Sequence, residues 1–174
     1  MQVGLIGFGY LGARLALSLG SEEHEVIAYD PGMEEDVIEQ LPSCNVYAVR
    51  SLKDLAESTT SKRVILMILD EFALDETLDE LLGYLSVGDI LVDISDSLRL
   101  DTARRAQQAL GLQINYLDCA AKVMSHPKAG LRIVVGGNRF AFNHCEEIWQ
   151  CLTNTEYIYA GRSGSGHATL NVEQ

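Results

Sequence analysis

Near its amino terminus the chain reads Val3-Gly4-Leu5-Ile6-Gly7-Phe8-Gly9-Tyr10-Leu11-Gly12, an apolar run that passes directly into closely spaced glycines. A short apolar run that ends at a glycine is typical of a buried strand. Residues 10–19 then place leucines at positions 11, 15 and 19, a spacing that predicts a helix. The stretch therefore predicts a strand, a tight turn and a helix in that order.

Strands and helices alternate along the rest of the chain. Further strands are expected at 24–29, 46–49, 64–69, 89–94, 114–118, 131–135 and 157–159, and helices at 33–41, from 51, at 71–85, 100–110, 140–152 and from 167. The run 64–69 is apolar throughout, as in a central parallel strand that is buried on both faces. The alternation predicts an α/β fold, a doubly wound and mostly parallel sheet of the Rossmann type.

Length and composition favour one globular domain. The chain has 174 residues, of which 47% are hydrophobic, and a formal net charge of −12, which opposes binding to nucleic acid or to an anionic membrane. Neither a signal peptide nor an apolar run of the ~20 residues that span a bilayer is present. The four cysteines lack metal-ligand spacing and are expected to be reduced and packed in the core. We expect a cytoplasmic protein.

The glycines at positions 7, 9 and 12 form a GxGxxG motif, and its context is informative. The motif follows a predicted strand, opens a predicted helix and lies in a strand-helix-strand unit. Gly7 would allow the tight turn, Gly9 the approach of a pyrophosphate, and Gly12 close packing of helix on sheet. The free amides and helix dipole would then hold the phosphates of a dinucleotide. The residues expected to bind it are Gly7, Phe8, Gly9, Tyr10, Leu11 and Gly12.

Asp30 ends the second predicted strand, 18 residues after Gly12. A carboxylate at this position can accept hydrogen bonds from both hydroxyls of an adenosine ribose, and it repels a 2′-phosphate. Pro31 and Gly32 supply no arginine for such a phosphate. The sequence therefore predicts NAD as the cofactor in preference to NADP. The alternative is that Asp30 only starts the turn before Pro31.

The order of these motifs, with HEVIAYD at 24–30, SVGDILVDIS at 86–95 and Gly136-Gly137 after a late strand, resembles a known family. It is similar to the N-terminal domain of the 6-phosphogluconate dehydrogenase and β-hydroxyacid dehydrogenase superfamily. Leu69-Asp70 stands where the dehydrogenases have Leu-Pro, as in the imine-reductase branch or in divergent phosphogluconate-dehydrogenase-like proteins. The resemblance covers nearly the whole chain.

The resemblance implies that the nicotinamide half of the cofactor passes Ile68, Leu69 and Ser95. It also brings Asp96 and Ser97 to the substrate, and it places His167 after a Gly/Ser loop, where the imidazole could donate a proton. The family's catalytic lysine has no counterpart, because Leu170 occupies that position in Gly164-Ser-Gly-His-Ala-Thr-Leu170. The expected division is a domain at 1–166 and, at 167–174, the start of a helix that in the family leads into a helical second domain.

Two functions remain open from the sequence, and a third possibility is a decayed fragment that has kept only its fold. One is hydride transfer with a small hydroxy-acid or imine-like substrate, in a cleft covered by a further domain, by a second copy in a homodimer or by another partner chain. The other is a non-catalytic module that binds or senses NAD(H) and acts through a protein partner. Lys122, His126 and Lys128 either hold an anion or belong to a solvated loop. Asp93 and Asp118, near strand ends, are expected to cap the following loops.

Overall fold

One sheet of eight strands forms the centre of the computed structural model, which describes residues 1–123, 131–153 and 156–170. The strands follow the order β3-β2-β1-β4-β5-β6-β7-β8 across the sheet. Their bounds are β1 Gln2–Ile6, β2 Glu25–Tyr29, β3 Val46–Ala48, β4 Val64–Met67, β5 Ile90–Asp93, β6 Asn115–Val123, β7 Leu131–Gly137 and β8 Tyr157–Gly161. All eight predicted strands are present, and the predicted fold class is confirmed.

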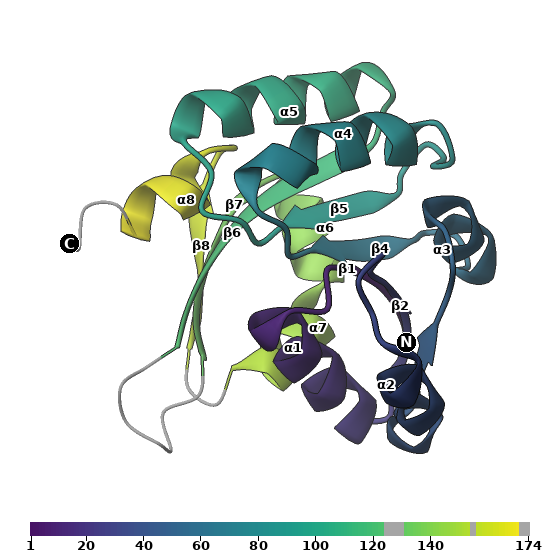
Figure 1. The fold of residues 1–174 in the computed structure, drawn as a ribbon. Helices are drawn as coiled ribbons and strands as arrows, with labels where there is room; N and C mark the ends of the chain where they lie inside the picture. Colours follow the sequence, from purple (N-terminus) through teal and green to yellow (C-terminus); the bar gives the residue numbers. More distant parts are fainter. Residues whose placement is uncertain (124–130, 154–155, 171–174) are drawn as a thin grey trace.

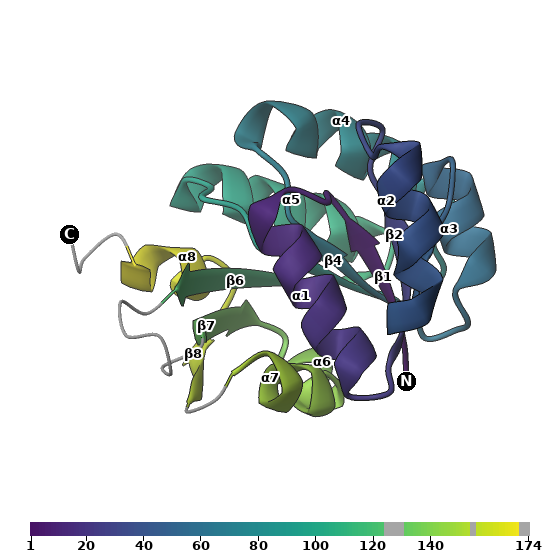
Figure 2. The same cartoon turned by 60° about the horizontal axis from the view of Figure 1, so that its bottom comes forward.

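Helices cover both faces of the sheet, as Figures 1 and 2 show from two directions. Helices α1, α6 and α7 lie on one face and α3, α4 and α5 on the other. The helix bounds are α1 Tyr10–Ser21, α2 Glu35–Gln40, α3 Leu52–Ser58, α4 Glu71–Leu82, α5 Arg99–Gly111, α6 Arg139–His144, α7 Glu146–Leu152 and α8 Ser165–Leu170. Among the residues described, no helix combines the length and the apolarity needed to cross a membrane.

Alternating side chains of the central strands supply both cores. In β1, Val3 and Leu5 belong to the cluster under α1 and α7, whereas Ile6 belongs to the cluster under α3 and α4. Leu15 and Leu19 bring α1 onto the first cluster, and both are fully buried. At ~25 cal/mol per Å² of buried apolar surface, this two-sided burial is the main stabilising contribution to the fold.

The sheet is parallel except at one pair. Strands β6 and β7 pair antiparallel from Leu117 opposite Gly137 to Val123 opposite Leu131, and the other neighbours pair parallel. The chain adds β2 and β3 on one side of β1 and then continues with β4 on the other side. A crevice for ligands is expected at this reversal, off the carboxyl ends of β1 and β4.

Several predicted helices have different limits in the structure. The predicted helix 140–152 is two helices, since α6 ends at His144 and α7 begins at Glu146, with Cys145 as the cap between them. The predicted helix 33–41 is shortened to α2 and is followed by a 3₁₀ turn at Leu41–Cys44. The predicted helix 71–85 ends at Leu82, where Gly83 caps it. The final helix starts two residues before His167, so the boundary predicted at 166/167 falls inside α8.

The cysteines are also only partly as predicted. Cys119 and Cys145 are buried, and burial raises the pKa of the Cys145 thiol to about 12. Cys44 is exposed at the end of the 3₁₀ turn, and Cys151 is half-buried, so the prediction of four core cysteines was wrong for Cys44. All four are free thiols.

Candidate functional site

The turn between β1 and α1 depends on backbone that only glycine can provide. Gly7 has φ +94°, and a Cβ there would lie 2.1 Å from the carbonyl oxygen of Ile68. A Cβ on Gly12 would lie 1.9 Å from the carbonyl oxygen of Gly7. Both contacts are with backbone, which cannot move aside cheaply. The tight turn predicted for Gly7 and the close packing predicted for Gly12 are therefore seen in the geometry.

Gly9 differs from the other two glycines because the space beside it is open. A Cβ on Gly9 would meet nothing within 4 Å. Gly9 is the N-cap of α1, and within the described structure no side chain caps this helix and its first turn has no acidic residue. The first hydrogen bond of the helix runs from the Ala13 amide to the Gly9 carbonyl oxygen at 2.9 Å. The amides of residues 10–12 therefore have no acceptor within the helix. Bare amides at the positive end of a helix dipole form an anion site.

Asp30 joins this turn to the end of β2. Its Oδ2 accepts a hydrogen bond from the Phe8 amide at 2.6 Å, and its Oδ1 accepts one from the Gly32 amide at 2.7 Å. The carboxylate is half-buried and ionised carboxylates have about four lone-pair sites, so it can accept further hydrogen bonds. Asp30 thus starts the turn, as the alternative interpretation expected, and it also faces the glycine-rich turn.

The second half of the carboxyl edge lies after β5. Ser95 donates its amide to the Asp93 carboxylate at 3.0 Å, and its hydroxyl lies 2.5 Å from the hydroxyl of Ser97. Ser97 also accepts a hydrogen bond from Arg105 at 2.6 Å and is 1% exposed. Asp96 is exposed between the two serines. Of this predicted substrate segment, only Asp96 presents its side chain to solvent.

Arg105 is a buried guanidinium that links α4 and α5 to this segment. It is 1% exposed, and its Nε donates to Asp75 at 2.7 Å. Burial alone lowers the pKa of Arg105, but the hydrogen bond to Asp75 and the charges of nearby acidic groups outweigh it and raise that pKa. The bonds from Arg105 and Arg104 hold the pKa of Asp75 below its ordinary value. The guanidinium therefore stays charged and fixes Ser97 in place.

Asp93 lies at the centre of a second buried group. Tyr116 donates its hydroxyl to Asp93 at 2.5 Å, and burial, followed by the Asp93 charge, raises the pKa of Tyr116. The prediction that Asp93 caps the following loop is confirmed by its bond to the Ser95 amide. The same prediction was wrong for Asp118, which lies inside β6: its carboxylate accepts the amides of Gly164 at 2.7 Å and His167 at 3.0 Å, at the start of α8. These bonds explain why the helix begins before His167.

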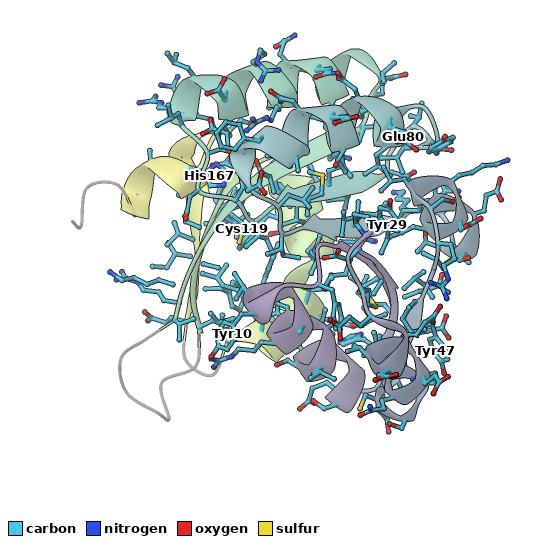
Figure 3. All side chains as sticks on the ribbon, viewed as in Figure 1. Tyr10, Tyr29, Tyr47, Glu80, Cys119 and His167 are labelled. Atoms are coloured by element: carbon cyan, nitrogen blue, oxygen red, sulfur yellow. The ribbon has the colours of Figure 1, made fainter. Side chains whose placement is uncertain are left out.

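His167 is 4% exposed, and both of its ring nitrogens contact protein groups. Nδ1 lies 2.8 Å from the hydroxyl of Thr102 and Nε2 lies 3.2 Å from the carbonyl oxygen of Asp93. Figure 3 shows His167 on α8, apart from Tyr10 at the start of α1. The proton-donor role expected of His167 stays a prediction, and in this arrangement the ring connects α8 to α5 and β5.

The remaining predicted residues are distributed along the same edge. Ile68 and Leu69 follow β4 and are half-buried, and Tyr10 is 81% exposed on α1. Lys122 is exposed on β6, and His126 and Lys128 lie outside the described residues. Sequence reasoning missed Arg105, although an arginine at the core-facing spacing of Thr102 and Ala109 was a usable signal.

Comparison with known proteins places this geometry in a family. The family model described as the NAD binding domain of 6-phosphogluconate dehydrogenase matches residues 2–161. A decarboxylating 6-phosphogluconate dehydrogenase of Buchnera aphidicola subsp. Baizongia pistaciae is 31% identical over 177 residues, covering 95% of this chain and 37% of that protein. An NAD(+)-dependent decarboxylating 6-phosphogluconate dehydrogenase of Haloferax volcanii is 28% identical, with 96% and 56% covered.

The fold is also seen in a solved structure. The 6-phosphogluconate dehydrogenase of Plasmodium falciparum superposes with a TM-score of 0.88 at 22% identity, covering 99% of this chain and 39% of that one. That structure was described in its apo form, with its cofactor NADP+ and with its substrate 6-phosphogluconate. The chain thus spans between about a third and somewhat over half of the length of these proteins.

Proposed function

The chain belongs to the family of NAD-binding domains of 6-phosphogluconate dehydrogenase. We propose that it binds a nicotinamide dinucleotide at the glycine-rich turn and that Asp30 makes it prefer NAD to NADP. The pyrophosphate would lie against the amides of the Gly7–Gly12 turn. The observation that carries this proposal is the uncapped start of α1 beside Gly9, the one glycine of the motif with open space at its Cβ position. A phosphate needs such bare amides and such space.

Asp30 supports the preference for NAD. Its carboxylate is fixed beside the glycine-rich turn by the amides of Phe8 and Gly32, and it keeps lone pairs for the ribose hydroxyls. A 2′-phosphate brought to this carboxylate would place two anions at hydrogen-bond distance, which costs free energy at low local dielectric. The relatives include NAD(+)-dependent and NADP+-binding proteins, so Asp30 is the residue on which the choice depends.

The nicotinamide half would pass Ile68, Leu69 and Ser95, at the carboxyl ends of β4 and β5. When bound, a nicotinamide dinucleotide supplies a hydride donor or acceptor. Asp96 is the exposed carboxylate that could orient a small hydroxy-acid or imine-like substrate beside it, while Ser97 would act by fixing the backbone of that segment. Hydride transfer needs a water-excluded site, so a further domain, a second copy or a partner chain would cover this edge.

A non-catalytic NAD(H)-binding or sensing role is the second candidate. It is favoured by His167 and Ser97, whose polar atoms bond within the protein, and by Leu170 at the position of the family's lysine. Both candidates share the dinucleotide site. We also propose a cytoplasmic location, which suits four free thiols.

Calorimetric titration with NAD, NADH, NADP and NADPH tests the proposal. We expect NAD to bind at least about tenfold more tightly than NADP, equivalent to roughly 1.4 kcal/mol. Asp30→Asn should reduce this ratio, because the charge that repels the 2′-phosphate is gone. Asp79→Asn makes the same charge change on exposed α4 and should leave the ratio unchanged. Tighter binding of NADP by the native chain would contradict the assignment of Asp30, and absence of binding to all four would contradict the function.

A further inference from the structure

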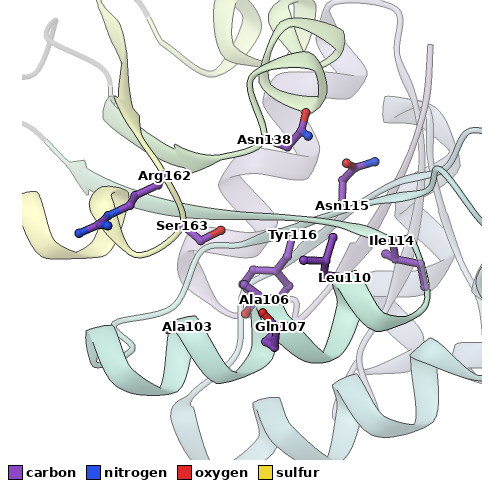
Figure 4. A pocket seen from close by; sticks show the side chains of 10 residues that line it. All are labelled: Ala103, Ala106, Gln107, Leu110, Ile114, Asn115, Tyr116, Asn138, Arg162 and Ser163. Carbon is purple, nitrogen blue, oxygen red and sulfur yellow. The ribbon is translucent and has the colours of Figure 1, made fainter.

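A cavity on the α5 side of the sheet lies away from the glycine-rich turn. Its volume is about 440 Å³, and Figure 4 shows its lining. The lining comes from α5, from the start of β6 and from the turns that follow β7 and β8: Ala103, Ala106, Gln107, Leu110, Ile114, Asn115, Tyr116, Asn138, Arg162 and Ser163. None of these residues follows β1, β2 or β4, where the dinucleotide site is proposed. Ligand sites in proteins typically have volumes of ~300 to 1,000 Å³.

The lining combines an apolar wall with hydrogen-bonding groups. The apolar part is formed by Ala106, Leu110, Ile114 and the ring of Tyr116. An apolar wall with a few convergent polar groups is the usual composition of a small-molecule site. It would accommodate the hydrocarbon body of a ligand.

The polar lining groups are mostly donors that the described structure leaves without a partner. Among residues 1–123, 131–153 and 156–170, no hydrogen bond or ion pair engages the side chains of Gln107, Arg162 or Ser163. Asn138 uses its Oδ1 to cap α6, through the amides of Phe140 and Ala141, so only its amide NH₂ group remains available. Arg162 is exposed at the rim, and in Figure 4 its guanidinium points away from the other lining side chains, so the side chain must rotate to reach a ligand in the cavity. Such a set favours a ligand with an acceptor group, above all an anion.

The charge around the cavity agrees with an anionic ligand. A smaller hollow of about 200 Å³ shares Asn115 and Asn138 with the cavity and adds Lys62 and His144 to the lining. Neither hollow has an acidic residue among its described lining residues. These linings thus combine basic side chains with no acidic ones in a chain whose formal net charge is −12. Anions at this point avoid the repulsion that the rest of the surface exerts.

We propose that this cavity is a second ligand site, distinct from the dinucleotide site, and that it binds a small organic carboxylate with an apolar body. The apolar body would lie against Ala106, Leu110 and Tyr116. The carboxylate would lie at the rim beside Ser163, and the exposed Arg162 side chain would turn inward to donate to it. The proposal does not depend on the proposed NAD preference.

Fluorescence titration with 1-naphthylacetate, and with 2-(1-naphthyl)ethanol as its uncharged counterpart, tests the site. We expect saturable binding of the carboxylate at one site per chain and weaker binding of the alcohol. Arg162→Gln should weaken carboxylate binding about tenfold, as loss of a charge-assisted hydrogen bond predicts, and leave alcohol binding unchanged. Arg104→Gln makes the same charge change on α5, beside Asp75, and should alter neither.

Two further measurements separate this site from the dinucleotide site. Ala106→Phe should fill the cavity and abolish binding of both probes, with its melting temperature measured to verify folding. Saturating NAD should not displace 1-naphthylacetate, and NAD affinity should be the same in Arg162→Gln. The proposal would be overturned if NAD displaced 1-naphthylacetate or if 1-naphthylacetate did not saturate. It would also be overturned if Arg162→Gln bound 1-naphthylacetate as tightly as the native chain does.

Discussion

The carboxyl edge of the sheet has two halves, the turn between β1 and α1 and the region of β5, β6 and α8. They differ in whether their polar groups are hydrogen-bonded within the protein. In the glycine-rich half, the helix α1 begins without a side-chain cap, and the space beside Gly9 is open. The other half is formed by β5, β6 and α8, and its charged residues are buried and hydrogen-bonded within the protein. Asp93 accepts the Ser95 amide, Asp118 accepts the Gly164 amide, and Arg105 donates to Ser97. The first half leaves backbone amides at the start of α1 unpaired, as the proposed dinucleotide site requires, whereas the second half pairs its polar side chains with its own loops.

Replacement of Gly12 is expected to have the largest effect. Gly12→Ala places a Cβ 1.9 Å from the carbonyl oxygen of Gly7, so α1 must move away from the sheet. We expect a loss of about 3 kcal/mol or more in the free energy of unfolding, measured by urea denaturation. Gly9→Ala is the matched variant, since its Cβ meets nothing within 4 Å. It should unfold like the native chain and yet bind NAD at least about tenfold more weakly. If Gly9→Ala bound NAD as tightly as the native chain does, the open space beside Gly9 would not be part of the ligand site.

Removal of the buried guanidinium is expected to have the next largest effect. Arg105→Met removes one hydrogen-bond donor from Ser97 and one from Asp75, and we expect the free energy of unfolding to fall by about 2 kcal/mol. Arg104→Met removes the other bond to Asp75 at an exposed position and should change the free energy by no more than about 0.5 kcal/mol. If the two substitutions lowered the free energy of unfolding equally, the buried hydrogen bonds of Arg105 would add no more stability than an exposed ion pair does.

Tyr116→Phe gives a smaller effect with a characteristic pH dependence. Loss of the hydroxyl donor to Asp93 should cost about 1 kcal/mol at neutral pH. Burial raises the pKa of Tyr116 in the folded chain, so the stabilisation is complete below the unfolded pKa of ~10 and is lost as pH rises above it. Urea denaturation from pH 9 to pH 11 should therefore show a shallower decline for Tyr116→Phe than for the native chain. Parallel declines would show that Tyr116 ionises normally in the folded state.

How much could be predicted from the sequence differs between the two halves. The strand, turn and helix around Gly7–Gly12 are determined by local residues, and their prediction was correct. The roles expected of Ser97 and His167 depended on which way side chains point and on partners such as Arg105 and Thr102, which lie elsewhere in the sequence. Periodicity reports which face of a helix is buried, but it does not report which buried polar groups meet.

The break at Cys145 shows the same limit for helices. The apolar spacing of residues 140–152 continues across the break, so the pattern alone predicts one helix. In the structure, the backbone amide of Cys145 donates hydrogen bonds to the carbonyl oxygens of Ala141 and Phe142, which ends α6. The indole N–H of Trp149 donates to the Phe142 carbonyl oxygen at 2.9 Å. A tertiary contact of the indole thus accompanies a change in helix direction that local spacing does not encode.

The turn after β1 is tied down on three sides by protein bonds. The Gly7 amide donates to Tyr29, the Ile68 amide to Ile6, and the Phe8 amide to Asp30. Preorganisation of this kind means that the conformational entropy of ordering the turn is lost when the chain folds and not when a ligand arrives. Association of a dinucleotide with this turn should consequently proceed in a single kinetic phase, with a rate that rises linearly with ligand concentration.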